Sequence, residues 1–97
     1  MRYTIVLSPE AVEDLRKLEA HKRSAVRDAI IEHLTHQPER VSRSRIKRLR
    51  GTSRPQYRLR ANDVRVFYDV SGTTVEILAI VPKSQAASWL DEWGESK

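Results

Sequence analysis

Residues 57 to 70, YRLRANDVRVFYDV, constrain the fold more than any other part of the chain. Apolar and charged residues alternate on both sides of a break at Ala61-Asn62-Asp63. Such alternation is typical of a β-strand with one buried face. Two such runs separated by a short turn predict a β-hairpin. The chain therefore needs a sheet, and other segments must cover its apolar face.

The length of the turn decides which side chains share a face. A loop with an even number of residues, such as a two-residue Asn62-Asp63 turn, pairs Arg60 with Arg65 across the hairpin. Arg58 then lies on the same face, two residues before Arg60. An odd loop would mix apolar and charged side chains on both faces, so the pattern favours the even one. The apolar face would carry Tyr57, Leu59, Val64, Val66 and Tyr68.

Arg58, Arg60 and Arg65 are a candidate anion site. Guanidiniums at neighbouring positions repel one another, and like charges are normally avoided across strands, unless an anion binds between them. The alternative is that the three arginines are separately solvated, and the sequence leaves both interpretations open. Arg65 is expected on the open face of the hairpin, where its replacement by alanine would leave the fold intact.

The N-terminal third predicts a strand followed by two helices. Residues 2 to 7 alternate as a strand does. Ser8 is a suitable N-cap and Pro9 suits the first position of a helix of about ten residues. A second helix is expected over residues 22 to 35, after a polar link at residues 20 to 22. Together they predict an antiparallel helical hairpin.

The remainder predicts a loop, more strands and a last helix. Residues 39 to 56 are expected to be mostly loop, with a short strand possible within RIKRLR, residues 45 to 50. Ser84 is expected to cap a helix over residues 85 to 93, where Trp89 and Trp93 are read as packing anchors rather than a base-stacking platform. The strands are expected at residues 56–60, 64–70 and 74–81, and the apolar side of the helix at Ala86, Ala87, Trp89, Leu90 and Trp93.

These elements predict one α+β domain over residues 1 to 97, with helices packed on one face of an antiparallel sheet of about four strands. An N-terminal helical hairpin would pack on that face, followed by a short C-terminal helix. The absence of cysteine excludes disulfides, thiolate metal sites and cysteine nucleophiles. His33 and His36 read as surface residues, so no metal is expected. No apolar run suits a membrane span or a signal peptide, which predicts a cytoplasmic protein.

Positive charge is concentrated in the middle of the chain. The net charge is +5, and nine bases but one acid, Asp63, lie between Ser42 and Arg65. A basic stripe of this kind indicates a polyanion or an acidic protein as partner. Motifs of phosphate-binding loops, metalloproteases and nucleotide-binding folds are absent.

Several features occur in an order that is specific in combination. An N-terminal strand and a helical hairpin with an acidic start precede KRLRG at residues 47 to 51. The YRLR…VRVFYDV hairpin follows, and then VEILAIVPKS at residues 75 to 84 ahead of a short terminal helix. In this the chain resembles the RelE/ParE superfamily of type II toxins over nearly its whole length, which implies a RelE-like fold.

The resemblance implies the RelE branch more than the ParE branch, because its RNA-cleaving members concentrate basic residues on these strands. Such toxins are small, metal-independent endoribonucleases without a cofactor, which cut mRNA on the ribosome. An acidic antitoxin encoded beside them holds them in check. The apolar anchors of its amphipathic segment would lie along exposed apolar positions of the helices or around Trp89 of the terminal helix. Its carboxylates would approach the arginines or displace the terminal helix from beside them, and either way it would block access to the arginines. The alternative is a non-enzymatic ParE-like toxin that binds DNA gyrase.

Site residues follow from the same resemblance. Arg58 and Arg65 match basic positions of the active hairpin, Arg60 neighbours them, and Lys83 closes the last strand. The arginines would stabilise the charge that builds up on the phosphoryl oxygens when a ribose 2′-hydroxyl attacks the adjacent phosphorus. Lys83 and Tyr68 are the candidates for a general acid or base. Family ribonucleases often carry an arginine where this chain has Ser84. They also often carry a tyrosine in the final helix, where this chain has Trp89-Leu90. Contacts to RNA are expected from Arg45, Lys47, Arg48, Arg50 and Arg54.

Overall fold

The computed structural model describes residues 1 to 96. Its main sheet has five strands in the order β1-β6-β5-β4-β2, and all neighbours are antiparallel except β1 and β6. The elements are β1 (Thr4–Leu7), α1 (Pro9–Lys17), α2 (Ala20–Leu34), β2 (Ile46–Arg48), β3 (Thr52–Arg54), β4 (Tyr57–Ala61), β5 (Val64–Ser71), β6 (Thr74–Pro82), α3 (Lys83–Trp93) and β7 (Glu95–Ser96). The predicted α+β class and the predicted central hairpin are confirmed.

The start of α1 follows from its first residues. The Ser8 hydroxyl accepts a hydrogen bond from Ala11 N at 3.1 Å, as an N-cap does, and Pro9 occupies the first helical position. The same hydroxyl donates to Leu78 O at 3.1 Å, which ties the helix to β6. The link to α2 is Leu18-Glu19, so the predicted link at residues 20 to 22 was placed too late.

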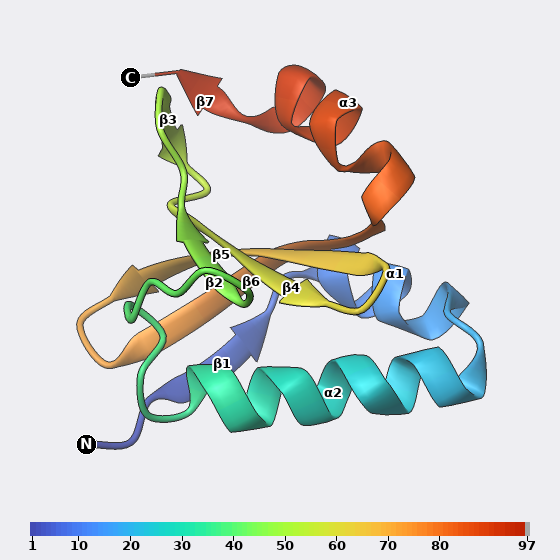
Figure 1. Ribbon diagram of the computed structural model, residues 1–97, viewed down its shortest axis with the longest axis horizontal. Helices are drawn as coiled ribbons and strands as arrows, with labels where there is room; N and C mark the ends of the chain where they lie inside the picture. Colours follow the sequence, from blue (N-terminus) through green and yellow to red (C-terminus); the bar gives the residue numbers. More distant parts are fainter. Residues whose placement is uncertain (97) are drawn as a thin grey trace.

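The sheet is covered on both faces (Figure 1). On one face Val26, Ile30 and Leu34 of α2 are buried against the inner side chains of the hairpin, and Ala11 of α1 joins them. On the opposite face α3 packs over a second apolar cluster. The expectation that all helices lie on one face was therefore wrong for α3. The hairpin side chains of the first core are Tyr57, Leu59, Ala61, Val64, Val66 and Tyr68, and the second cluster is Leu49, Phe67, Ala79 and Val81.

The details of α3 differ from the prediction. The helix begins at Lys83, directly after Pro82, so Ser84 already lies in its first turn and does not cap it. Trp89 stacks on Phe67, with 4.8 Å between ring centroids and 9° between planes, which confirms it as a packing anchor. Trp93 does not pack in this way, since it is 63% exposed, and Ala87 is also exposed.

Two short strands, β3 and β7, were not predicted from the sequence. β3 pairs with β7, bringing Thr52 opposite Ser96 and Arg54 opposite Glu95. Residues 39 to 56 are therefore less of a loop than expected, because both β2 and β3 lie within them. This small sheet ties the end of α3 back to the segment before β4 (Figure 1). Within residues 1 to 96, no helix is long and apolar enough to cross a membrane.

Candidate functional site

The β4–β5 hairpin has the register that the sequence predicts. Ala61 pairs with Val64, which leaves a two-residue turn in which Asn62 adopts a φ of 56°, a conformation that asparagine tolerates better than most residues. Arg60 pairs with Arg65. Arg58 lies on the same face, as expected. We refer to Arg58, Arg60 and Arg65 as the arginine cluster.

Arg65 is the most buried member of the arginine cluster, at 6% exposed. One terminal nitrogen of its guanidinium donates to Asn62 O at 2.8 Å and to Val64 O at 3.2 Å. The expectation of an open position was therefore wrong, because β5 is the central strand and Arg65 folds back onto the turn. Arg60, its exposed partner across the hairpin, is the more accessible guanidinium.

Arg58 is half-buried and incompletely bonded. No atom within residues 1 to 96 accepts a hydrogen bond from its buried Nε. Burial lowers the pKa of Arg58, and the charge of Arg60 adds to that effect. An unpaired buried donor is costly, and a guanidinium stays charged at neutral pH. Because Nε is shielded from solvent, an anion would reach this side chain through its terminal nitrogens.

The cluster has no internal counter-charge. In the part of the chain that the structure describes, none of its members is among the side chains that form ion pairs within 4.0 Å. Burial lowers the pKa of Arg65, and the charges of Arg58 and Arg60 lower it further. Asp63 acts in the opposite direction but is paired with Lys22 at 3.1 Å. The positive charge of the cluster is therefore available to a ligand.

Lys83 and Tyr68 occupy contrasting positions. Lys83 is exposed and follows Pro82, which pairs with Val64, and its backbone N–H donates to Asp63 O at 2.7 Å. It therefore lies beside the hairpin turn. Tyr68 is fully buried in the first core and donates to Pro38 O at 2.6 Å. Burial raises the pKa of Tyr68, which makes it unsuitable for proton transfer to a ligand.

The basic segment before the hairpin is divided between the two faces. Lys47 pairs with Arg58 and so shares the face of the arginine cluster, where it is exposed. Arg48 pairs with Tyr57 on the other face, and its guanidinium carbon lies 5.1 Å from the centre of the Tyr57 ring. Of these two residues, only Lys47 extends the cluster.

The other bases expected to contact RNA are spread more widely. Arg45 donates to Arg60 O at 3.3 Å, while its side chain lines a cavity beside α2. Arg50 is exposed. Arg54 is engaged by two carboxylates, Asp69 at 3.4 Å and Glu76 at 3.1 Å. The structure thus brings Lys47 to the cluster and holds Arg54 in ion pairs elsewhere.

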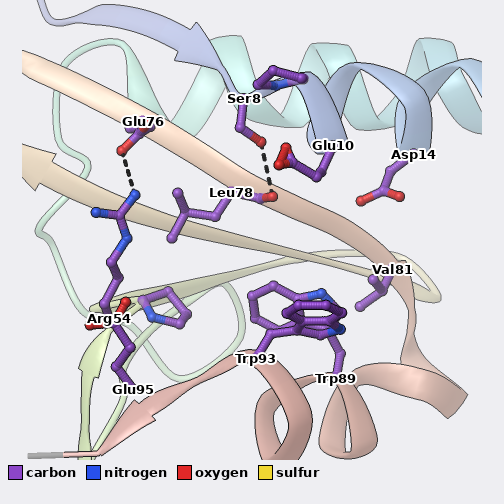
Figure 2. A pocket seen from close by; sticks show the side chains of 12 residues that line it. Ser8, Glu10, Asp14, Arg54, Glu76, Leu78, Val81, Trp89, Trp93 and Glu95 are labelled. Carbon is purple, nitrogen blue, oxygen red and sulfur yellow. Dashed lines mark hydrogen bonds and ion pairs between the residues drawn. The ribbon is translucent and has the colours of Figure 1, made fainter.

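A cavity of about 810 Å³, whose lining includes no member of the arginine cluster, lies between α1, β6 and the end of α3 (Figure 2). Its walls include Trp89, Trp93, Glu10 and Asp14. No sequence pattern predicts this cavity, because its walls come from segments as far apart as Ser8 and Leu78, and from β7, which has no sequence signal. The spacing of two tryptophans four residues apart on an exposed helix was the one signal available.

Solved structures of toxins share this fold. The chain is 30% identical to a chain of the RelBE2 toxin–antitoxin complex from Mycobacterium tuberculosis, with a TM-score of 0.70, covering 84% of this chain and 99% of that one. It is 26% identical to a chain of the RelE–RelB complex from Pyrococcus horikoshii, with a TM-score of 0.61, covering 88% and 99%. A mutant of the Escherichia coli toxin RelE in the free state, 22% identical, has a TM-score of 0.70, covering 95% and 93%.

A family-level comparison agrees with these structures. Residues 5 to 87 match the family described as the ParE toxin of the type II toxin–antitoxin system, parDE. No curated protein matches the chain. The match spans most of the sequence, and it includes the hairpin that carries the arginine cluster. The chain therefore belongs to the RelE/ParE superfamily of type II toxins.

Proposed function

We propose that this toxin is a ribosome-dependent, metal-independent mRNA endonuclease that inhibits translation. The observation that carries the proposal is the arginine cluster, in which three guanidiniums share a face and none is ion-paired within the described residues. A phosphodiester supplies both the negative charge and the acceptor oxygens that this surface lacks. Guanidiniums bind phosphate oxygens bidentately and do not lose their charge at neutral pH.

The proposed reaction is attack of a ribose 2′-hydroxyl on the adjacent phosphorus. The 2′ oxygen bonds to phosphorus, the bond to the 5′ oxygen breaks, and the products are a cyclic phosphate and a 5′-hydroxyl end. Negative charge builds up on the non-bridging oxygens. Arg60 and Arg58 would bind these oxygens, while Arg65 fixes the turn and adds its charge. Preorganised donors of this kind are among the largest contributions to catalysis.

Protons must leave the 2′-hydroxyl and reach the 5′ oxygen. Lys83, exposed beside the hairpin turn, is the titratable side chain we assign to the leaving oxygen. An ammonium group there would donate a proton or stabilise charge as the bond breaks. Arginine is a poor proton carrier, so we place the uptake of the 2′ proton on a group of the ribosome or on solvent.

We include the ribosome in the proposal because the exposed basic residues extend over a wider surface than one phosphate of mRNA would contact. Lys47 is exposed on the face of the arginine cluster and Arg50 is exposed just after β2, and we propose that both bind phosphates of ribosomal RNA. Two neighbours that are 30% and 26% identical come from complexes whose names pair RelE-type toxins with RelB-type antitoxins. We therefore also propose a co-encoded antitoxin, with carboxylates that reach the arginine cluster and block RNA.

One observation favours a second candidate function. The matching family is named after ParE rather than RelE. The second candidate is a non-enzymatic toxin that binds DNA gyrase. Such a protein has no chemical need for an uncompensated arginine cluster, so we place it second.

Induction in cells separates the two functions. Primer extension on abundant mRNAs after brief induction should show new 5′ ends within coding regions, and replacing Arg60 by alanine should remove them. Arg27→Ala, which removes one exposed charge from α2, serves as the control. New DNA breaks with intact mRNA would favour the gyrase-binding function and contradict the nuclease.

A further inference from the structure

The cavity between α1, β6 and α3 has a composition unlike the rest of this basic chain. Trp89 and Trp93 lie along one side of it, and Glu10 and Asp14 of α1 lie across from them (Figure 2). Trp89 is held by its stack on Phe67. Trp93 is 63% exposed, an unusual position for so large an apolar ring.

The charge of this cavity is opposite to that of the arginine cluster. Arg54 is the single base among the residues that line it, and it is already paired with Glu76 and Asp69. Glu10, Asp14 and Glu95 also line it, and within residues 1 to 96 no base lies within 4.0 Å of their carboxylates. Asp14 accepts from Ile80 N at 3.0 Å, which fixes its place. Three carboxylates thus line the same cavity as the exposed tryptophan.

Aromatic rings beside unpaired carboxylates suit a cationic side chain. A guanidinium stacks on an indole ring and can donate to a carboxylate from its edge. An ammonium group is more strongly hydrated and forms a less planar contact, so arginine fits better than lysine. The volume of about 810 Å³ also leaves room for an apolar neighbour of that arginine against Leu78 and Val81.

We propose that this cavity binds an arginine side chain of the antitoxin. The antitoxin would then carry two kinds of anchor, carboxylates for the arginine cluster and an arginine flanked by apolar residues for the tryptophan-lined cavity. Charges arranged in this order fix the direction in which the segment binds, because the reverse direction would place like charges together. This inference rests on the proposed antitoxin partner, and it does not depend on RNA cleavage.

Two peptides and the two indole N–H signals of the chain test the proposal. The probes are the acetylated and amidated pentapeptide Gly-Leu-Arg-Leu-Gly and its twin with citrulline, which has the same shape without the charge. NMR titration should show the Trp93 signal shifting with a Kd about fivefold lower for the arginine peptide. Glu10→Gln should weaken that binding by roughly two- to fivefold. Glu13→Gln on the same helix, outside the cavity, should leave it unchanged.

The complex supplies the second arm of the test. When the chain is co-purified with the small protein encoded beside it, the Trp93 signal should already be shifted and should no longer respond to the peptide. Equal binding of the two peptides, or a cavity still open in the complex, would overturn the proposal. A larger shift of the Trp93 signal with guanosine monophosphate than with the arginine peptide would also overturn it, because the ligand of the cavity would then be RNA. Self-association of the chain that is lost in Glu10→Gln would overturn it too, because the cavity would then bind a second copy of the chain. An absence of RNA cleavage would contradict the proposed nuclease alone.

Discussion

At the scale of residues, the three arginines divide their tasks. Arg65 is buried and bonds two carbonyls of the turn, whereas Arg60 is exposed opposite it. The sequence predicted their shared face, because alternation and an even turn fix the register. It did not predict that Arg65 is buried while Arg60 is exposed. The burial of Arg65 depends on the position of β5 in the centre of the sheet, which no local pattern encodes.

Arg65→Ala should therefore destabilise the protein. Two carbonyl oxygens lose a charged donor, which typically costs about 1.5–3 kcal/mol, while relief of repulsion from Arg58 and Arg60 offsets part of it. We expect the free energy of unfolding in urea to fall by about 1–2 kcal/mol. Arg60→Ala should change it by less than about 0.5 kcal/mol. Equal stability of the two variants would show that Arg65 does not hold the turn.

Asp69 provides a test by pH. Burial raises the pKa of Asp69 above its ordinary value, although the backbone N–H of Gln56 donates to it and Arg54 lies close. The folded protein thus holds this proton more tightly than the unfolded chain. The resulting stabilisation is fully present below about pH 4 and is lost as the pH rises through the raised pKa.

The variant Asp69→Asn isolates this effect. It removes the titration, so the stability of the wild type relative to the variant should fall from about pH 4 towards neutral pH. Urea unfolding of both proteins over this pH range measures the difference in stability. The contributions of the other carboxylates are the same in both proteins and cancel in that difference. A difference that grows with pH would mean that the ion pair with Arg54 outweighs burial.

At the scale of elements, α3 attaches to the sheet through one tryptophan and leaves the other exposed. Trp89 stacks on Phe67, and Trp93 borders the cavity. The sequence located this helix within two residues but could not distinguish its two tryptophans. The distinction depends on how α3 lies over the sheet, which places Trp89 on Phe67 and Trp93 at the cavity, and no local pattern encodes this.

Replacing each tryptophan by alanine should separate their roles. Trp89→Ala should lower the free energy of unfolding by roughly 2–4 kcal/mol, somewhat below the range for fully buried aromatic residues because Trp89 is partly exposed. Trp93→Ala should change it by less than about 0.5 kcal/mol. Chemical denaturation measures both, and similar losses would contradict the assignment of Trp93 to a binding surface.

At the scale of the whole molecule, charge of opposite sign is gathered in two places. The arginine cluster lies on β4 and β5, and the acidic cavity is bordered by α1 and β6. The sequence predicted the first, because nine of its bases fall in one segment. It could not predict the second, because Glu10, Glu76 and Glu95 are distant in sequence and meet only through the fold.

The salt dependence of ribosome binding tests the extent of the basic surface. In the double variant Lys47→Ala and Arg50→Ala, the slope of the logarithm of affinity against that of salt concentration should decrease in magnitude by about two, one for each lost phosphate contact. Lys17→Ala with Arg27→Ala removes the same charge from the helices and should leave the slope unchanged. Equal slopes in the two double variants would show that Lys47 and Arg50 do not belong to the ribosome-binding surface.

The most direct test of the central claim is cleavage of a defined mRNA by the purified protein with ribosomes programmed at a known codon. We expect cleavage at that codon without added cofactor, leaving a 5′-hydroxyl and a cyclic phosphate. We also expect a loss of roughly 10²–10³-fold in the single-turnover rate for Arg60→Ala, and none for Arg27→Ala. An unchanged rate in Arg60→Ala, or no cleavage by the folded wild type, would contradict the assignment of the arginine cluster to RNA cleavage.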